Sequence, residues 1–336
     1  MAYLSLGGRR QIHPDRTSRR RSVRTSYREP VVTVVDLNLE KDGGEDTPAG
    51  GLPQRWLDAH HEILKPLKAD VILRQEASYS HLDDDRRLKA AGELMGMEGF
   101  LSANGAGLNP TALFVRPETF PFFERKTYNA MFWRTPPTVV SARFADAPEA
   151  ELLLMSWHAA FNSPRGRERE ADEITAWVDR MERLGGFIGG GDCNEYPIED
   201  GESIPPIDWS TVTDRAHIHH RTILAPDTSR VSCTYLDRAL LTSGLHDAAR
   251  YAAHTLGQPD AIGATAGHAK PGQGGPRRID RVYTDGRIAR AVLAVNVLDT
   301  TGISDHHGIQ VVLSRRGLAE ALRREHRPVP PVQAVA

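Results

Sequence analysis

The chain has 336 residues, of which 40% are hydrophobic and 26% charged, so it can bury a sizeable core. No run of eighteen apolar residues occurs, and no apolar segment follows the first arginines, so we expect neither a transmembrane helix nor a secretory signal. With only two cysteines a disulfide framework is excluded, and we expect a reducing compartment, the cytoplasm.

The net charge of −2 is unevenly distributed along the chain. Residues 1–29 carry eight arginines against two acidic residues, which leaves a net charge of −8 on the remainder. A basic arm can bind a polyanion such as DNA or RNA. The same composition is typical of a disordered leader, and we favour that interpretation for residues 1–30. The acidic body is also unlike the broad positive surface of nonspecific DNA-binding proteins.

The first third of the body alternates buried strands with helices. Residues 31–39 (VVTVVDLNL) are β-branched and nearly continuous, which predicts a buried strand that ends near Asn38. Apolar residues at helical spacing predict a helix over 52–67, with His60 and His61 expected on its surface. A second buried strand over 70–74 ends at Glu76, a carboxylate poorly placed for packing and well placed for a metal ion.

The middle of the chain repeats this arrangement. A helix is predicted over 86–97, and β-rich runs within 99–116 and 130–144 predict antiparallel strands. Residues 151–158 (ELLLMSWH) form another expected buried strand that ends at His158, followed by a loop with Asn162. Ser163 and Pro164 are typical of a helix start, and a helix with one apolar face follows them.

A glycine-rich strand, 186–191, leads into Asp192, Cys193 and Asn194. On a strand, Asp192 and Asn194 would point to the same face, where both can reach one phosphate or water, while Cys193 points into the core. An Asx-rich turn after the strand is the alternative interpretation.

Residues 196–275 are long and mixed, with a helix expected near 236–245. They contain a histidine cluster at 217, 219 and 220 that lacks the other ligands of a structural zinc site. Long loops beyond the ends of strands often form substrate-recognition surfaces. A basic helix is predicted over 315–326, and we divide the chain into a basic arm (1–30), a catalytic domain (31–316) and a C-terminal helix and tail (317–336).

The stretch Gly274–Gly308 contains the most distinctive polar pattern. Asp280 is expected at the end of one strand, and Asp305 and His306 precede the next one. A carboxylate that hydrogen-bonds a histidine fixes its tautomer and stabilises the imidazolium, which suits proton transfer at phosphorus. This pattern predicts a buried acid–imidazole couple beside a metal carboxylate.

Five strand-end motifs stand in one order along the chain: LNLE, RQE, WHAAFN, GGGDCN, and RIDRVY with SDHH. Over residues 31–313 this order resembles the endonuclease/exonuclease/phosphatase superfamily, the DNase I-like metallophosphoesterases. The resemblance implies a four-layer α/β sandwich, in which two mostly antiparallel sheets pack face to face between helices. It also implies hydrolysis of phosphate esters with Mg²⁺ or Mn²⁺.

The resemblance also implies roles for individual residues. Glu76 resembles the principal metal carboxylate, with Asn38 and Asp305 near the ion. Asp192 and Asn194 match the family's Asp-x-Asn, which positions water and phosphate, and His306 with Asp280 matches its His–Asp couple. Either His306 or Asp192 is the general base.

Two further residues are expected near the phosphate, His158 and Asn162. In pancreatic DNase the histidine that corresponds to His158 is paired with a glutamate, and here Asn109 stands at that position. The departure argues against a leaving-group acid at His158 and leaves a hydrogen bond to phosphate as its expected role.

The sequence therefore predicts a monomeric, metal-dependent phosphoesterase that cleaves a phosphodiester, with nucleic acid as the favoured substrate, by direct attack of water. A phosphatase or phospholipase C-type esterase that acts on a small phosphomonoester or a lipid head group is the first alternative. A non-catalytic binding scaffold of the same fold is the second, and it is disfavoured because such proteins usually lose a metal carboxylate or the histidine.

Overall fold

The computed structural model describes residues 27, 29–103, 109–181, 184–268 and 270–326. Most of the basic arm expected over residues 1–30 and the whole of 327–336 lie outside the described residues. Among the described helices, none combines the length and the apolar character needed to cross a bilayer.

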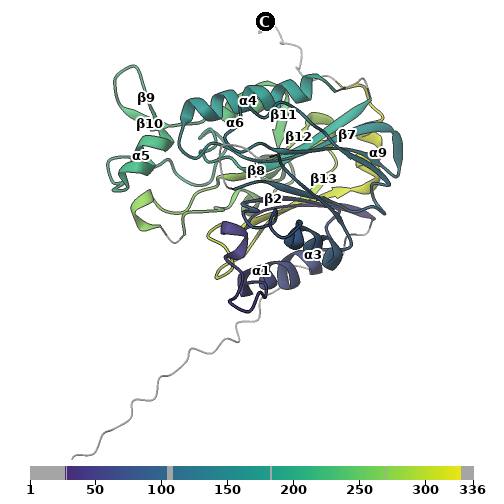
Figure 1. The fold of residues 1–336 in the computed structure, drawn as a ribbon. Helices are drawn as coiled ribbons and strands as arrows, with labels where there is room; N and C mark the ends of the chain where they lie inside the picture. Colours follow the sequence, from purple (N-terminus) through teal and green to yellow (C-terminus); the bar gives the residue numbers. More distant parts are fainter. Residues whose placement is uncertain (1–26, 28, 104–108, 182–183, 269, 327–336) are drawn as a thin grey trace, which may run out of the picture.

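Two six-stranded sheets pack face to face in the centre of the molecule (Figure 1). The first sheet contains, in spatial order, β13 (Val292–Leu298), β14 (Gly308–Ser314), β1 (Val31–Asn38), β2 (Val71–Gln75), β4 (Ala112–Val115) and β3 (Glu98–Leu101). The second contains β11 (Leu245–Asp247), β12 (Asp280–Asp285), β8 (Gly185–Asp192), β7 (Ala147–His158), β6 (Thr138–Phe144) and β5 (Phe122–Arg125). Each sheet has one parallel pair, β1 with β2 and β7 with β8, and its other neighbours are antiparallel. The predicted mostly antiparallel sandwich is confirmed.

Helices cover the outer faces of both sheets. On the first sheet lie α1 (Gln54–Asp58), the π-helical turn η2 (Ala59–Leu64), α2 (Lys65–Leu67) and α3 (Arg86–Met95), and on the second lie α4 (Pro164–Asp179) and α6 (Tyr235–Thr242) (Figure 1). Other helices around these two sheets are α7 (Ala248–Thr255), α8 (Gly286–Ala289) and α9 (Arg315–Leu322), with short 3₁₀ turns η1 (Glu40–Gly43), η3 (Pro259–Ile262) and η4 (Pro271–Gln273).

Hydrophobic residues fill three layers, as the alternation of strand side chains requires. Between the sheets, Val34 and Leu73 of the first pack against Leu154 and Ile188 of the second. Outer-face residues of each sheet pack against the helices that cover it. Helix α9 closes the central layer with Leu318 and Leu322, and it ends four residues earlier than predicted.

The prediction that His60 lies on the surface is wrong. Its side chain is fully buried, stacked on Trp56 with ring centroids 3.8 Å apart, whereas His61 is exposed. The helix over 54–67 includes a π-helical turn at Ala59–Leu64, which His60 shares. His60 also stands four residues after Trp56 and four before Leu64, so it lies on the apolar face of the helix, and the expectation of a surface position rested on the residue type alone.

The strand ends that carry the five motifs meet at one edge of the sandwich. Asn38 is opposite Gln75 in the first sheet, and His158 is opposite Asp192 in the second. Asp280 also pairs with Asp192, but it begins β12 and does not end a strand as predicted. Because β12 runs antiparallel to β8, the start of one strand lies beside the end of the other.

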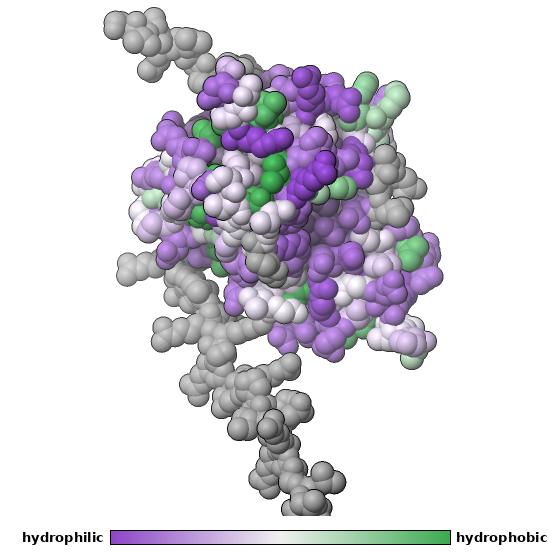
Figure 2. Space-filling model, turned by 90° about the vertical axis from the view of Figure 1, so that its left-hand side faces the viewer, coloured by the Kyte–Doolittle hydropathy of each residue, from purple (hydrophilic) through white to green (hydrophobic). Residues whose placement is uncertain are grey.

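A small outlying lobe extends from this edge. It contains α5 (Arg215–Arg221) and the hairpin of β9 (Thr222–Leu224) and β10 (Arg230–Ser232), visible on the left of Figure 1. Viewed from that side, the surface is mostly hydrophilic and hollowed near its centre (Figure 2). The lobe belongs to the long segment for which the sequence predicted a recognition surface.

Candidate active site

A cleft of about 240 Å³ opens at the edge where the strand-end motifs meet. Its lining includes six of the predicted site residues: Glu76, His158, Asp192, Asn194, Asp305 and His306. Asn38 and Asp280 lie behind this lining and contact Asp192 and His306. Asn162, the remaining predicted residue, does not line the cleft.

Asp192 lies at the centre of the cluster. Its Oδ2 accepts a hydrogen bond from Asn38 Nδ2 at 3.2 Å, and it lies 3.5 Å from His158 Nε2 and 3.8 Å from His306 Nε2. Burial alone would raise the pKa of Asp192, but the contact with His158 and the charge of His306 outweigh it and lower the pKa. The carboxylate is therefore ionised at neutral pH.

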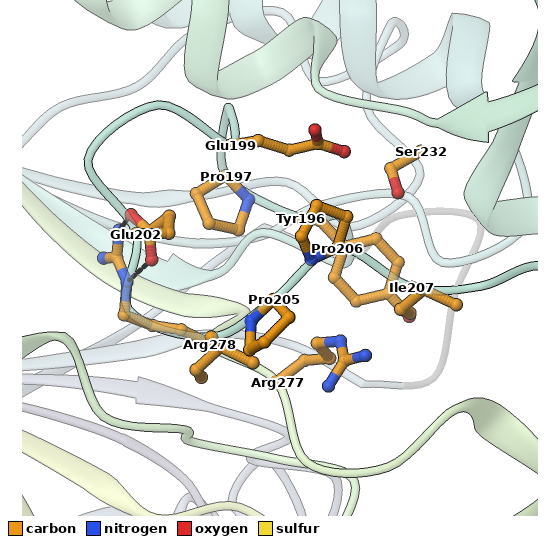
Figure 3. A pocket seen from close by; sticks show the side chains of 11 residues that line it. Tyr196, Pro197, Glu199, Glu202, Pro205, Pro206, Ile207, Ser232, Arg277 and Arg278 are labelled. Atoms are coloured by element: carbon orange, nitrogen blue, oxygen red, sulfur yellow. Dashed lines mark hydrogen bonds and ion pairs between the residues drawn. The ribbon is translucent and has the colours of Figure 1, made fainter.

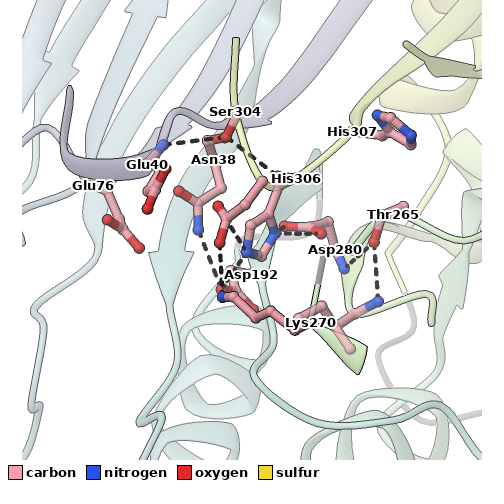
Figure 4. A network of polar contacts seen from close by, with 12 residues as sticks. Asn38, Glu40, Glu76, Asp192, Thr265, Lys270, Asp280, Ser304, His306 and His307 are labelled. Carbon is pink, nitrogen blue, oxygen red and sulfur yellow. Dashed lines mark hydrogen bonds and ion pairs between the residues drawn. The ribbon is translucent and has the colours of Figure 1, made fainter. Parts of the chain in front are cut away.

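His306 and Asp280 form the predicted buried couple (Figure 4). His306 Nδ1 donates to the Asp280 carboxylate, at 2.8 Å to Oδ2 and 3.0 Å to Oδ1. Burial opposes protonation of the imidazole, but the Asp280 charge and hydrogen bond raise the pKa of His306 to about 10. Thr265 Oγ1 accepts the Asp280 backbone N–H at 3.0 Å and so holds the start of β12 in place.

Asn194 is held in a turn and not on a strand. Its φ is +50°, and its backbone N–H donates to Asp192 Oδ1 at 2.7 Å, the geometry of an Asx turn. The prediction that Asp192 and Asn194 share a strand face is therefore wrong, although both side chains line the cleft. Cys193 between them is fully buried, as predicted.

His158 lacks the carboxylate partner of the DNase histidine. Its Nδ1 is buried, and no described residue accepts or donates a hydrogen bond there. Asn109, at the position expected for the glutamate, lines the cleft and accepts a hydrogen bond from Ser78 Oγ at 2.8 Å. Burial opposes protonation of His158, yet its contact with Asp192 raises the pKa.

The residues expected near a metal ion offer oxygen donors toward one region. Asn38 Oδ1 is buried without a hydrogen-bond partner among the described residues. Glu76 Oε2 accepts the Lys41 N–H at 2.8 Å, and Asp305 Oδ2 contacts Lys270 Nζ at 2.8 Å. Carboxylate and amide oxygens are the ligands of Mg²⁺ and Mn²⁺. The donor set therefore fits a hard divalent cation.

A second group also meets the spacing of a metal site. Ligand atoms of Asp192, Asp280 and His306 lie within 4.8 Å of one another. However, the Asp280 hydrogen bond and the raised pKa of His306 favour the imidazolium, which has no lone pair to give a metal. We therefore interpret this group as the acid–imidazole couple.

The sequence matches no protein-family model and no curated protein. Solved structures do match the fold. One is an endonuclease/exonuclease/phosphatase family protein from Bacteroides thetaiotaomicron, with a TM-score of 0.56 and 17% identity over 85% of this chain and 98% of that one. A mannosyl-6-phosphatase from the same organism has a TM-score of 0.55 and 17% identity over 83% and 98% of the two chains. The 3′ phosphatase NExo from Neisseria, solved with a product DNA hairpin, has a TM-score of 0.53 and 16% identity over 83% and 98%.

The chain has the endonuclease/exonuclease/phosphatase fold. This confirms the fold expected from the five motifs. At these identities the similarity concerns the fold, so the chemistry of this chain is argued from its own residues.

The sequence did not predict which residues form the far wall of the cleft in this endonuclease/exonuclease/phosphatase fold. It consists of Tyr196, His217, Arg221, Lys270, Gln273 and Arg277, all from the segment between the Asp192 turn and β12. The only sequence signal was the length of that segment. No motif singled out these side chains, because the folding of a long connection decides which of them face the cleft.

Proposed function

We propose that this chain is a divalent-metal-dependent phosphoesterase that hydrolyses a phosphate ester by direct attack of water. The observation that carries the proposal is the Asp280–His306 couple, whose Nε2 faces Asp192 inside the cleft that Glu76 and Asp305 also line. An oriented imidazole, a buried ionised carboxylate and oxygen donors for a cation are the groups that this reaction requires.

Glu76, Asn38 and Asp305 would hold the cation, which would supply positive charge to stabilise the negative charge that develops on the phosphate. Asp192 orients the attacking water and takes its proton, while the His306 imidazolium stabilises the charge on the phosphoryl oxygens. His158 and Asn194 hydrogen-bond to the phosphate. Asn194 Nδ2 donates one of its two N–H groups to Ala159 O at 2.9 Å, and the other remains for the phosphate.

Water is the nucleophile in this proposal. The described residues that line the cleft include no serine, threonine or cysteine, and Cys193 is fully buried. A covalent intermediate on a serine, threonine or cysteine side chain therefore has no support among these residues.

For the substrate class, we favour a phosphodiester, with nucleic acid first, and a small phosphomonoester or lipid head group second. The fold neighbours include both a 3′ phosphatase with product DNA and a sugar phosphatase. The cationic wall of the cleft suits either class. A non-catalytic scaffold is disfavoured by the presence of every predicted catalytic and metal side chain.

The test is hydrolysis of bis(p-nitrophenyl) phosphate by the purified protein with Mg²⁺, with Mn²⁺ and with EDTA. We expect metal-dependent turnover that falls by roughly 10²-fold or more in His306→Ala and in Asp192→Asn, the scale of a lost proton-transfer group. His61→Ala, which removes an exposed histidine, is the matched control. Rates near wild type in both site variants would contradict the mechanism, and p-nitrophenyl phosphate tests the monoester alternative.

A further inference from the structure

Arginines that are buried in the body of this protein are paired with acids. Arg278 contacts Glu202 and Asp247, with its Nη1 2.6 Å from the Asp247 carboxylate. Arg74 contacts Asp42 at 2.7 Å, as expected for a guanidinium removed from water. The two half-buried arginines of the cleft wall, Arg221 and Arg277, can be compared with these pairs.

Arg221 and Arg277 on the cleft wall are not paired in this way. Arg221 donates to Phe161 O at 2.8 Å and to Asn194 Oδ1 at 2.5 Å. Arg277 donates only to its own neighbour, Pro276 O, at 2.7 Å, and its Nε is buried without a partner. Within the described part of the chain, no carboxylate lies within 4 Å of either guanidinium.

The polar groups between these arginines do not cancel their charge. The Tyr196 hydroxyl and His217 Nε2 share a hydrogen bond of 2.6 Å. Burial raises the pKa of Tyr196 to about 12 and lowers that of His217 to about 4, so both are neutral at pH 7. Arg221 and Arg277 both act electrostatically on the Tyr196 hydroxyl, so the two cations flank one neutral surface.

Arg277 and Tyr196 line the catalytic cleft and also an adjoining hollow of about 30 Å³ (Figure 3). Glu199 and Glu202 line this hollow as well, and Glu202 is paired with Arg278, so a second phosphate would bind on the cleft side of Arg277. Arg221 contacts Asn194, so it lies next to the catalytic cluster. A guanidinium has five N–H donors and binds phosphate in a bidentate manner.

We propose that the cleft binds a substrate with two phosphates, the scissile one at the catalytic cluster and a second one at Arg277 beside Arg221. This inference rests on the proposed phosphoesterase function for the role of the first position. The second phosphate is either the neighbouring phosphate of a nucleic-acid strand or the second group of a small bisphosphate.

The experiment is titration calorimetry on the full chain with two matched pairs of probes. Thymidine 3′,5′-bisphosphate is compared with thymidine 5′-monophosphate, and inositol 1,4-bisphosphate with inositol 1-phosphate. We expect wild type to prefer one bisphosphate over its monophosphate by roughly tenfold, the scale of one charge-assisted contact. The pair that shows the preference identifies the source of the second phosphate.

Arg277→Met should abolish this preference while leaving monophosphate affinity within about twofold, and Arg277→Lys should retain part of it. Arg215→Met, which removes an exposed arginine from α5 outside the cleft, is the control for total charge. A preference that survives in Arg277→Met, or its absence in wild type, overturns the inference. An Arg277-dependent preference without hydrolysis of any ester would instead refute the proposed function and leave the binding site standing.

Discussion

At the scale of single residues, burial decides the charge of His60. The side chain is fully buried, and its Nδ1 lies 2.8 Å from Trp56 O. Burial, and then the nearby Arg74 guanidinium, lower the pKa of His60 well below its ordinary value. Arg74 Nη1 is 3.5 Å from His60 Nε2 and is itself held by Asp42. The imidazole is therefore neutral in the folded state.

This neutrality makes folding stability depend on pH. In the unfolded chain a histidine titrates near pH 6.5, so below that pH the unfolded state binds a proton that folded His60 does not. The contribution of neutral His60 to the free energy of unfolding is fully present above about pH 6.5. Below that pH the free energy of unfolding falls by up to about 1.4 kcal/mol per pH unit. Urea unfolding at pH 7.5 and 5.5 should show a smaller loss in His60→Gln than in wild type. His61→Gln is the exposed control, and an equal loss in wild type and His60→Gln would contradict the assignment.

The sequence allowed prediction of those site residues that stand beside regular strands. Glu76 and Asp192 follow continuous apolar runs, so the position of each carboxylate at a strand end could be inferred. The Asx turn at Asn194 depends on a local backbone conformation that hydrophobic periodicity does not report. Arg277 was beyond prediction because only the folding of the long connection brings it to the cleft wall beside Tyr196.

At the scale of elements, β8 requires glycine where it approaches β7. Gly191 has a φ of +150°, and a Cβ placed there would lie 1.9 Å from Trp157 O and 2.9 Å from Trp157 C. These are backbone atoms of the neighbouring strand, so they cannot move without breaking the β7–β8 pairing. The residue that follows is Asp192, so the close approach of the two strands also sets the position of the central carboxylate.

Gly191→Ala should therefore destabilise the protein by about 2–4 kcal/mol and reduce phosphoesterase activity in the fraction that folds. Gly257→Ala is the matched control: its φ is +68°, but nothing lies within 4 Å of the added Cβ. That variant should lose only about 1 kcal/mol, the cost of the left-handed conformation. Thermal and urea unfolding separate the two, and equal losses would show that collision with Trp157 is not the cause.

At the scale of the whole molecule, the negative charge of the body and of the cleft opposes the binding of an anionic phosphate substrate. The chain outside residues 1–29 carries a net charge of −8, and Glu76, Asp192 and Asp305 add three acidic groups to one cleft. Of the described residues, two cations lie within ion-pair distance of Asp305, with Lys270 Nζ at 2.8 Å and His306 Nε2 at 3.9 Å. A bound divalent cation would offset the remaining negative charge, and its binding energy would add to folding stability.

Mg²⁺ or Mn²⁺ should therefore raise the unfolding temperature even where no substrate is present. A ligand that binds only the folded state at 100 times its dissociation constant contributes about 2.7 kcal/mol. Glu76→Gln should lose most of this stabilisation, because it removes the charge of the principal expected ligand. Glu62→Gln, an exposed acid on the π-helical turn, is the control for net charge, and NaCl at matched ionic strength is the control for screening. If Glu76→Gln responds to Mg²⁺ and Mn²⁺ as wild type does, the ion binds elsewhere; if NaCl gives the same shift, the effect is screening of the acidic body and not a site.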